Sequence, residues 1–138
     1  MNGKGYYIDN FGNQKFFSNK DRHFFDNMGL KKLVMNKSCE LVYCEQNRLI
    51  ELILNHKCLK VVCWNNQLKE LIIPDGCKYV NCHNNQLTKL IIPDGCEIVY
   101  CRGNQLKELI IPDGCKRVKA DMKSVTLINK VDELNLWI

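Results

Sequence analysis

Cysteine is the residue type with the widest chemical potential in this sequence. The 138 residues include nine cysteines and three histidines. Cysteine thiolates hold metal ions and act as nucleophiles, and cysteine pairs form disulfides. So many cysteines in a chain of this length usually indicate a disulfide framework or a zinc site. The spacing of the cysteines shows whether either interpretation fits.

The cysteines recur at two places of a 19-residue period. They form the series Cys39, Cys58, Cys77, Cys96 and Cys115 and the series Cys44, Cys63, Cys82 and Cys101. Stacked periods make each series a column, and two parallel columns cannot direct four thiolates to one tetrahedral zinc ion. We therefore expect no metal and no cofactor, and we interpret the cysteines as small apolar core residues. Column neighbours would lie within disulfide range, but the odd count and the lack of a signal-peptide pattern predict reduced thiols.

His83 is the other candidate for chemistry, because it follows Cys82 directly. Successive side chains of a strand point to opposite faces, so this adjacency does not make a cysteine–histidine pair. The sequence shows no phosphate loop, serine elbow or carboxylate pair in a supporting frame. We predict that the protein is not an enzyme and has no catalytic residues.

The period also predicts the elements. Residues 71–77, Leu-Ile-Ile-Pro-Asp-Gly-Cys, return at 90–96 and 109–115, and Leu33, Leu52 and Ile128 fall on the same grid. A fixed period of this length is typical of a solenoid, here with about five copies over residues 39 to 133. Each copy contributes one short parallel strand with alternating side chains. The return half is too short for a helix and should run extended, with Pro-Asp-Gly in a type I turn, Pro second and Gly fourth.

The ninth residue of each copy is asparagine. Its amide can bond backbone groups of its own and adjacent turns, which predicts a structural ladder. The ladder consists of Asn47, Asn66, Asn85 and Asn104.

One copy resembles the leucine-rich repeat pattern L-x-x-L-x-L-x-x-N-x-L, with Cys96, Val99, Cys101, Asn104 and Leu106 at its marked places. The resemblance covers roughly residues 30 to 130 and departs from the family in having Cys where Leu is usual. It implies a mainly β, right-handed leucine-rich repeat solenoid of about five 19-residue turns. A parallel sheet would form one face, extended segments and turns the other, and caps would close both ends.

The cysteine-bearing repeat, together with abundant Asn, Lys and Ile, is similar to the short leucine-rich repeat proteins of giant DNA viruses of amoebae. This resemblance implies a protein of the host cytoplasm or the virion that engages a host or viral protein.

We expect one domain in three parts: an aromatic N-terminal cap at 1–32, the solenoid at 33–127 and a C-terminal cap at 128–138. The first part should hold a hairpin around residues 9–13 and a partial turn. The second cap should place Leu134, Leu136 and Ile138 inward. The lid is expected to use all five phenylalanines, which are Phe11, Phe16, Phe17, Phe24 and Phe25. The alternative is that the aromatic start recruits another protein.

Function should come from the outward strand positions, which change from copy to copy while the inward ones hardly vary. Tyr, Trp and Arg are enriched there, as in binding hot spots, which predicts a protein-binding face. A merely tolerant surface is the alternative. The candidate residues are Tyr43, Lys60, Trp64, Tyr79, Asn81, His83, Tyr100, Arg102, Arg117 and Lys119.

A second surface is the middle residue of each Leu-Ile-Ile segment. If Leu and the second Ile point inward, Ile53, Ile72, Ile91 and Ile110 form an outward apolar stripe. Such a stripe could pair with a second molecule, as a homodimer, or dock onto the caps. A local twist that tucks these residues in is the other interpretation.

Charge and hydropathy limit the partners. The net charge of +5 suggests an acidic protein or nucleic acid as a minor alternative partner, although the outward strand positions carry only a modest positive excess. The chain contains no run of about 18 apolar residues and no signal-peptide pattern, which predicts a soluble cytoplasmic protein that does not enter a membrane.

Overall fold

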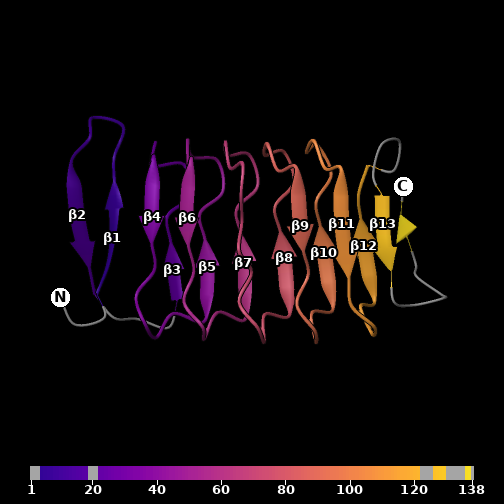
Figure 1. The fold of residues 1–138 in the computed structure, drawn as a ribbon. Helices are drawn as coiled ribbons and strands as arrows, with labels where there is room; N and C mark the ends of the chain where they lie inside the picture. The colour runs from indigo at the N-terminus through magenta and orange to yellow at the C-terminus, as the bar shows by residue number, and fades with distance from the viewer. Residues whose placement is uncertain (1–3, 19–21, 122–125, 130–135, 138) are drawn as a thin grey trace.

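The computed structural model describes residues 4–18, 22–121, 126–129 and 136–137, the last two ranges as strands only. Every regular element in these ranges is a strand, and none of them is a helix. The strands are stacked from one end of the molecule to the other (Figure 1). The chain is a β-solenoid of about five turns that repeat roughly every 19 residues.

One sheet of seven parallel strands, the front sheet, runs along the whole molecule. Its order is β3 (Arg22–Phe24), β5 (Leu41–Tyr43), β7 (Lys60–Val62), β8 (Tyr79–Asn81), β10 (Ile98–Tyr100), β12 (Arg117–Lys119) and β14 (Leu136–Trp137). In five successive strands the middle residue is a valine with no exposed surface: Val42, Val61, Val80, Val99 and Val118. Their neighbours within each strand therefore point away from the core.

The opposite side, the back face, carries two shorter ladders. The first joins β4 (Lys32–Val34) to β6 (Glu51–Ile53), and the second joins β9 (Lys89–Ile91), β11 (Glu108–Ile111) and β13 (Thr126–Asn129). Residues 70–73 lie between them in sequence, and in the described part of the chain their backbone joins neither ladder. The back face is thus interrupted at its middle turn.

An antiparallel hairpin lies at the N-terminal end. It consists of β1 (Gly5–Ile8) and β2 (Gln14–Phe17), and β1 also pairs antiparallel with β4. The Asp9 carboxylate accepts hydrogen bonds from the backbone N–H groups of Phe11 and Asn13, both at 2.9 Å, which holds the hairpin turn.

The expectation that all five phenylalanines form a lid is wrong. Phe17 and Phe25 do pack together around His23, with ring centroids 4.6 to 5.2 Å apart. Phe11, Phe16 and Phe24 are instead 86%, 47% and 65% exposed. The reason is that residues 22–24 already form a front strand, so alternation turns Phe24 outward and His23 and Phe25 inward.

The nine cysteines are free and buried, as the two-column interpretation expects. Burial raises the pKa of the Cys44, Cys63 and Cys82 thiols well above its usual range and raises the pKa of Cys96 and Cys101 to about 12. These thiols pack in the core as neutral apolar groups.

The Pro-Asp-Gly turn differs from the expected type I turn. The N–H of Cys77 donates to the carbonyl of Pro74 at 3.2 Å, so Pro is the first residue of the turn rather than the second. Gly76 is then third, and its φ of 89° is the left-handed value that a type II turn requires there. Only glycine adopts that value without strain, which explains its recurrence.

The last turn is one residue shorter than the period. Ile128 pairs with Ile110 and Leu127 with Leu109, so Ile128 does not occupy the Leu109 position that the 19-residue grid assigned to it. Leu136 likewise pairs with Val118. Leu134 and Ile138, and the side chain of Leu136, lie outside the described residues.

Candidate functional site

Four asparagines hold the chain where it leaves the front strands. The Asn85 amide nitrogen donates to the carbonyls of Cys82 in its own turn and Cys63 in the preceding turn, at 3.1 and 3.0 Å. Its oxygen accepts from the N–H of Leu68 at 3.0 Å. The equivalent bonds recur at the other members of the ladder, Asn47, Asn66 and Asn104. The outward residues just before them therefore sit on a fixed backbone.

A continuous row of rings and ammonium groups crosses the front sheet. Phe24 stacks on Tyr43 with centroids 5.0 Å apart, and Lys60 lies 5.3 Å from the Tyr43 ring and 4.5 Å from the Tyr79 ring. Tyr79 meets the edge of Tyr100 at 5.8 Å, and Lys119 lies 5.3 Å from the Tyr100 ring. We call these residues the aromatic row: Phe24, Tyr43, Lys60, Tyr79, Tyr100 and Lys119. It spans six adjacent strands.

A second pair of rings lies just beyond the strand ends. Trp64 and His83 stack nearly parallel, with centroids 5.3 Å apart and an interplanar angle of 6°. The Nδ1 atom of His83 is 2.6 Å from Oδ1 of Asn81. Burial lowers the pKa of His83, so the neutral ring is favoured, and Nδ1 carries the proton that it donates to Asn81.

The charged groups of this face give it a small positive excess. Lys60, Lys119, Arg102 and Arg117 are opposed by Glu45 and Asp121, so four cations less two anions leave +2. The Asp121 carboxylate accepts a hydrogen bond from the Gly103 N–H at 2.6 Å and is therefore partly engaged by the backbone.

All ten residues that the sequence nominated lie on this face with some exposed surface. Arg102 and Arg117 are exposed, and the others are half-buried. The structure joins Trp64 to His83 and Tyr79 to Tyr100, as two ring pairs rather than one cluster. Sequence reasoning missed Phe24, which it assigned to the cap, although Phe24 stands 19 residues before Tyr43 and so on the same grid.

The side chains of this face offer particular contacts to a binding partner. His83 is held by an amide, not by a carboxylate or a nucleophile. Within the described ranges no three His, Cys, Asp or Glu side chains are grouped so that they could hold a metal ion. Ordered aromatic surfaces with a few cations instead offer stacking and cation–π contacts.

No protein-family model matches the chain, and comparisons with the curated proteins and with the solved structures gave no match either. In the described residues there is no helix long and apolar enough to cross a membrane. We therefore argue the function from the side chains on the outward face of the front sheet.

Proposed function

We propose that this protein is a non-catalytic interaction module that binds another protein through the outward face of its front sheet. The observation that carries the proposal is the aromatic row, flanked by the stacked Trp64 and His83. Tyr, Trp and Arg are the side chains most enriched where binding energy concentrates.

The shape of the face favours a macromolecule. Seven strands at about 4.8 Å each make a sheet roughly 29 Å long, which is longer than a small-molecule ligand and suits a macromolecule. The described part of the face is covered by rings that already contact one another, and all of them except the exposed Phe24 are half-buried. Because these rings are held in place before binding, less side-chain entropy is lost when a partner covers them.

The resemblance to leucine-rich repeat proteins of amoebal viruses extends this proposal to a host or viral protein as the partner and to the cytoplasm or virion as the location. An acidic protein or a nucleic acid stays the minor alternative, supported by the +2 excess on the face. Lys60 and Lys119 already lie over tyrosine rings, which favours an aromatic interface over a stripe of phosphate contacts.

A pull-down from amoebal lysate tests the proposal. The wild-type protein is compared with Trp64→Ala/Tyr100→Ala, which removes one ring from each pair. Phe11→Ala is the matched control, because Phe11 is an exposed aromatic residue of the hairpin, away from the front sheet. We expect one or more proteins to be recovered by wild type and Phe11→Ala but not by the double variant. Equal recovery of every protein by all three would refute the front face as the binding site.

A further inference from the structure

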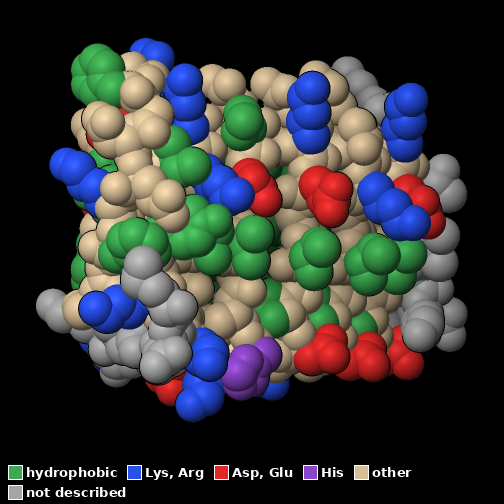
Figure 2. All heavy atoms as spheres, turned by 60° about the vertical axis from the view of Figure 1, so that its left-hand side comes forward, with side chains coloured by type: hydrophobic (Ala, Val, Ile, Leu, Met, Phe, Trp, Pro, Cys, Tyr) green, Lys and Arg blue, Asp and Glu red, His purple; other side chains and the backbone are tan. Residues whose placement is uncertain are grey.

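The isoleucines of the back face point outward. Ile53, Ile72 and Ile91 are 45%, 74% and 53% exposed, and Ile110 is half-buried. Figure 2 shows hydrophobic side chains in a band across this face, bordered on one side by basic and acidic groups. The other side is bordered by acidic groups over part of its length and by histidine and basic groups over the rest. A band of this kind is a common mark of an interaction surface.

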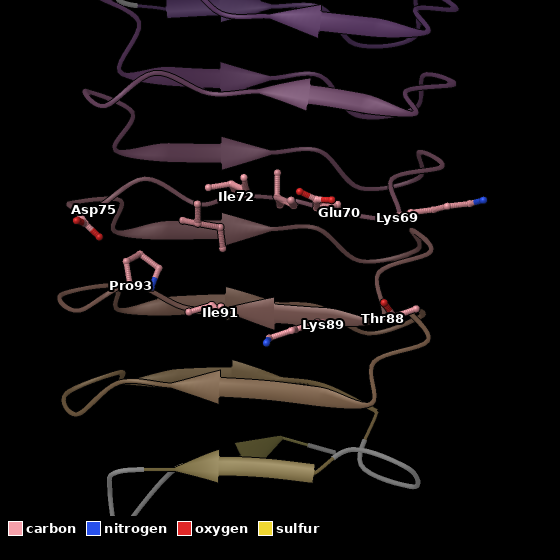
Figure 3. Close-up of a pocket in the computed structure, with 10 residues that line it drawn as sticks. Lys69, Glu70, Ile72, Asp75, Thr88, Lys89, Ile91 and Pro93 are labelled. Atoms are coloured by element: carbon pink, nitrogen blue, oxygen red, sulfur yellow. The ribbon is translucent and has the colours of Figure 1, made fainter.

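The middle of the band is a ridge between two hollows. One hollow of about 520 Å³ lies between Ile72 and Ile91, and one of about 550 Å³ lies between Ile53 and Ile72. In Figure 3, Glu70 and Lys89 lie towards one end of the first hollow, and Asp75 and Pro93 towards the other. The ridge is the turn that joins neither back-face ladder. The exposed Ile72 therefore stands between two hollows, where it can contact a second apolar surface.

The charged border of the band has a definite order of signs. One residue per turn occupies it: Lys32, Glu51, Glu70, Lys89 and Glu108. Lys32 pairs with Glu51 at 3.2 Å, and Lys89 pairs with Glu108 at 3.5 Å. Glu70, at the centre, has no ion pair with any described residue. The order is therefore plus, minus, minus, plus, minus.

We propose that the back face binds a second copy of this chain across a twofold axis that runs parallel to the strands and passes through the turn of Glu70 and Ile72. This axis reverses the order of turns in the second copy. Lys32 then faces Glu108 of the partner subunit, and Glu51 faces Lys89 of the partner subunit. Each pair occurs twice, so the two existing ion pairs of each chain become networks of four charges.

Other registers oppose like charges. Moving the axis half a turn towards β6 sets Glu51 against Glu70 and Lys32 against Lys89. Moving it half a turn towards β9 sets Glu70 against Lys89 but Glu51 against Glu108. A twofold axis along the solenoid would bring Glu70 against Asp75 on the acidic border. In the proposed register Lys32, Glu51, Lys89 and Glu108 all face opposite charges. The like pairs are those of the central turn, where Glu70, Lys69 and Asp75 each face their own copy. The order of charges along the border therefore favours this arrangement.

The size of the surface predicts a weak dimer. Five turns at about 4.8 Å, and about six residues at 3.3 Å each, give a face of roughly 24 by 20 Å. Two such faces bury on the order of 1,000 Å², the lower end for specific interfaces. We expect dissociation constants on the order of 10–100 μM.

Sedimentation velocity over about 1 to 500 μM tests association. The wild-type mass should rise from 16.1 kDa towards twice that value. Ile72→Lys should stay monomeric, because a charge would enter the apolar band. Glu70→Gln should dimerise about threefold more tightly, because the like pair on the axis is removed. Trp64→Ala/Tyr100→Ala should behave as wild type, which separates this surface from the front face. A wild type that stays monomeric throughout, or an Ile72→Lys variant that dimerises equally, overturns the proposal.

Disulfide cross-linking tests the position of the axis. Glu70→Cys would bring two copies of residue 70 together on the axis, so mild oxidation should give a covalent dimer. In Lys107→Cys the two copies would lie about four turns apart, roughly 19 Å and beyond disulfide reach. The nine native thiols are buried and compete poorly. Equal cross-linking of the two variants, or none in Glu70→Cys at concentrations where it is dimeric, contradicts the register.

Discussion

At the scale of single residues, the asparagine side chains join backbone groups that would otherwise be buried without partners. Asn85 is 6% exposed and bonds three backbone groups, one in its own turn and two in the preceding turn. The ladder could be predicted from the recurrence of one residue type at the ninth place of each copy. Which carbonyls it would reach could not, because that depends on how closely the turns stack.

Replacing Asn85 with Ala should lower the free energy of unfolding by about 3 kcal/mol, because three buried backbone groups in two turns lose their partner. Urea denaturation of the variant and wild type measures the change. Gln86→Ala is the control, since the Gln86 side chain makes no hydrogen bond within the described chain, and it should cost under about 1 kcal/mol. Similar losses in the two variants would contradict the structural role of the ladder.

His83 should make stability depend on pH. Burial holds its pKa below the ordinary value of 6.5, so the unfolded chain binds a proton more readily than the folded chain. This contribution to stability is present above about pH 6.5 and is lost as the pH falls through the folded pKa. The melting temperature of His83→Gln should therefore fall less between pH 7 and pH 5 than that of wild type. His56→Gln, which changes an exposed histidine, should keep the wild-type slope; a His83→Gln profile parallel to wild type would count against the effect.

At the scale of elements, alternation within the strands could be predicted, but contacts between them could not. Lys60 points outward because Val61, the next residue of the same strand, points into the core. Its position between the Tyr43 and Tyr79 rings depends on a diagonal contact with Tyr43 and a direct cross-strand contact with Tyr79, which no single strand specifies. Phe24 was missed for the related reason that its strand lies in a segment of different composition.

The break in the back face could not be predicted from the sequence either. Residues 71–74, Leu-Ile-Ile-Pro, have the same letters as 90–93 and 109–112, yet only the latter two segments hold ladder strands. Because these segments have the same sequence but differ in strand pairing, the neighbouring turn and not the local sequence determines whether a ladder forms.

Amide hydrogen exchange should reveal this break. The amides of residues 70–73 lack ladder bonds and should exchange at least about tenfold faster than those of residues 89–92. Measurement by NMR at a few micromolar keeps the chain monomeric, so a partner does not protect them. Equal protection of the two segments would mean that the back face is continuous in solution.

At the scale of the whole molecule, the period alone was enough to predict the solenoid, but not where its first and last turns lie. The front sheet begins at β3, inside the segment assigned to the cap, and the last turn is one residue short of the period. At both ends the sequence departs from the repeat, so the 19-residue pattern does not predict the structure there.

The cysteine columns predict inert thiols in the folded protein. All nine are buried, and burial raises the pKa of Cys44 and Cys82. With a thiol reagent at pH 7.5, we expect under one label per folded chain in an hour and nine per chain in urea. Rapid labelling without denaturant would show that the columns open readily.

We assign the front face to a partner protein and the back face to a second copy of the chain. The function depends on the claim that the front face binds another protein. The most direct measurement is photo-cross-linking in amoebal lysate, with a photoreactive phenylalanine analogue in place of Tyr79 or of Phe11. We predict that the probe at Tyr79 captures one defined protein and that the probe at Phe11 does not. Identical capture from both positions, or none from Tyr79 at any protein concentration, would contradict the claim.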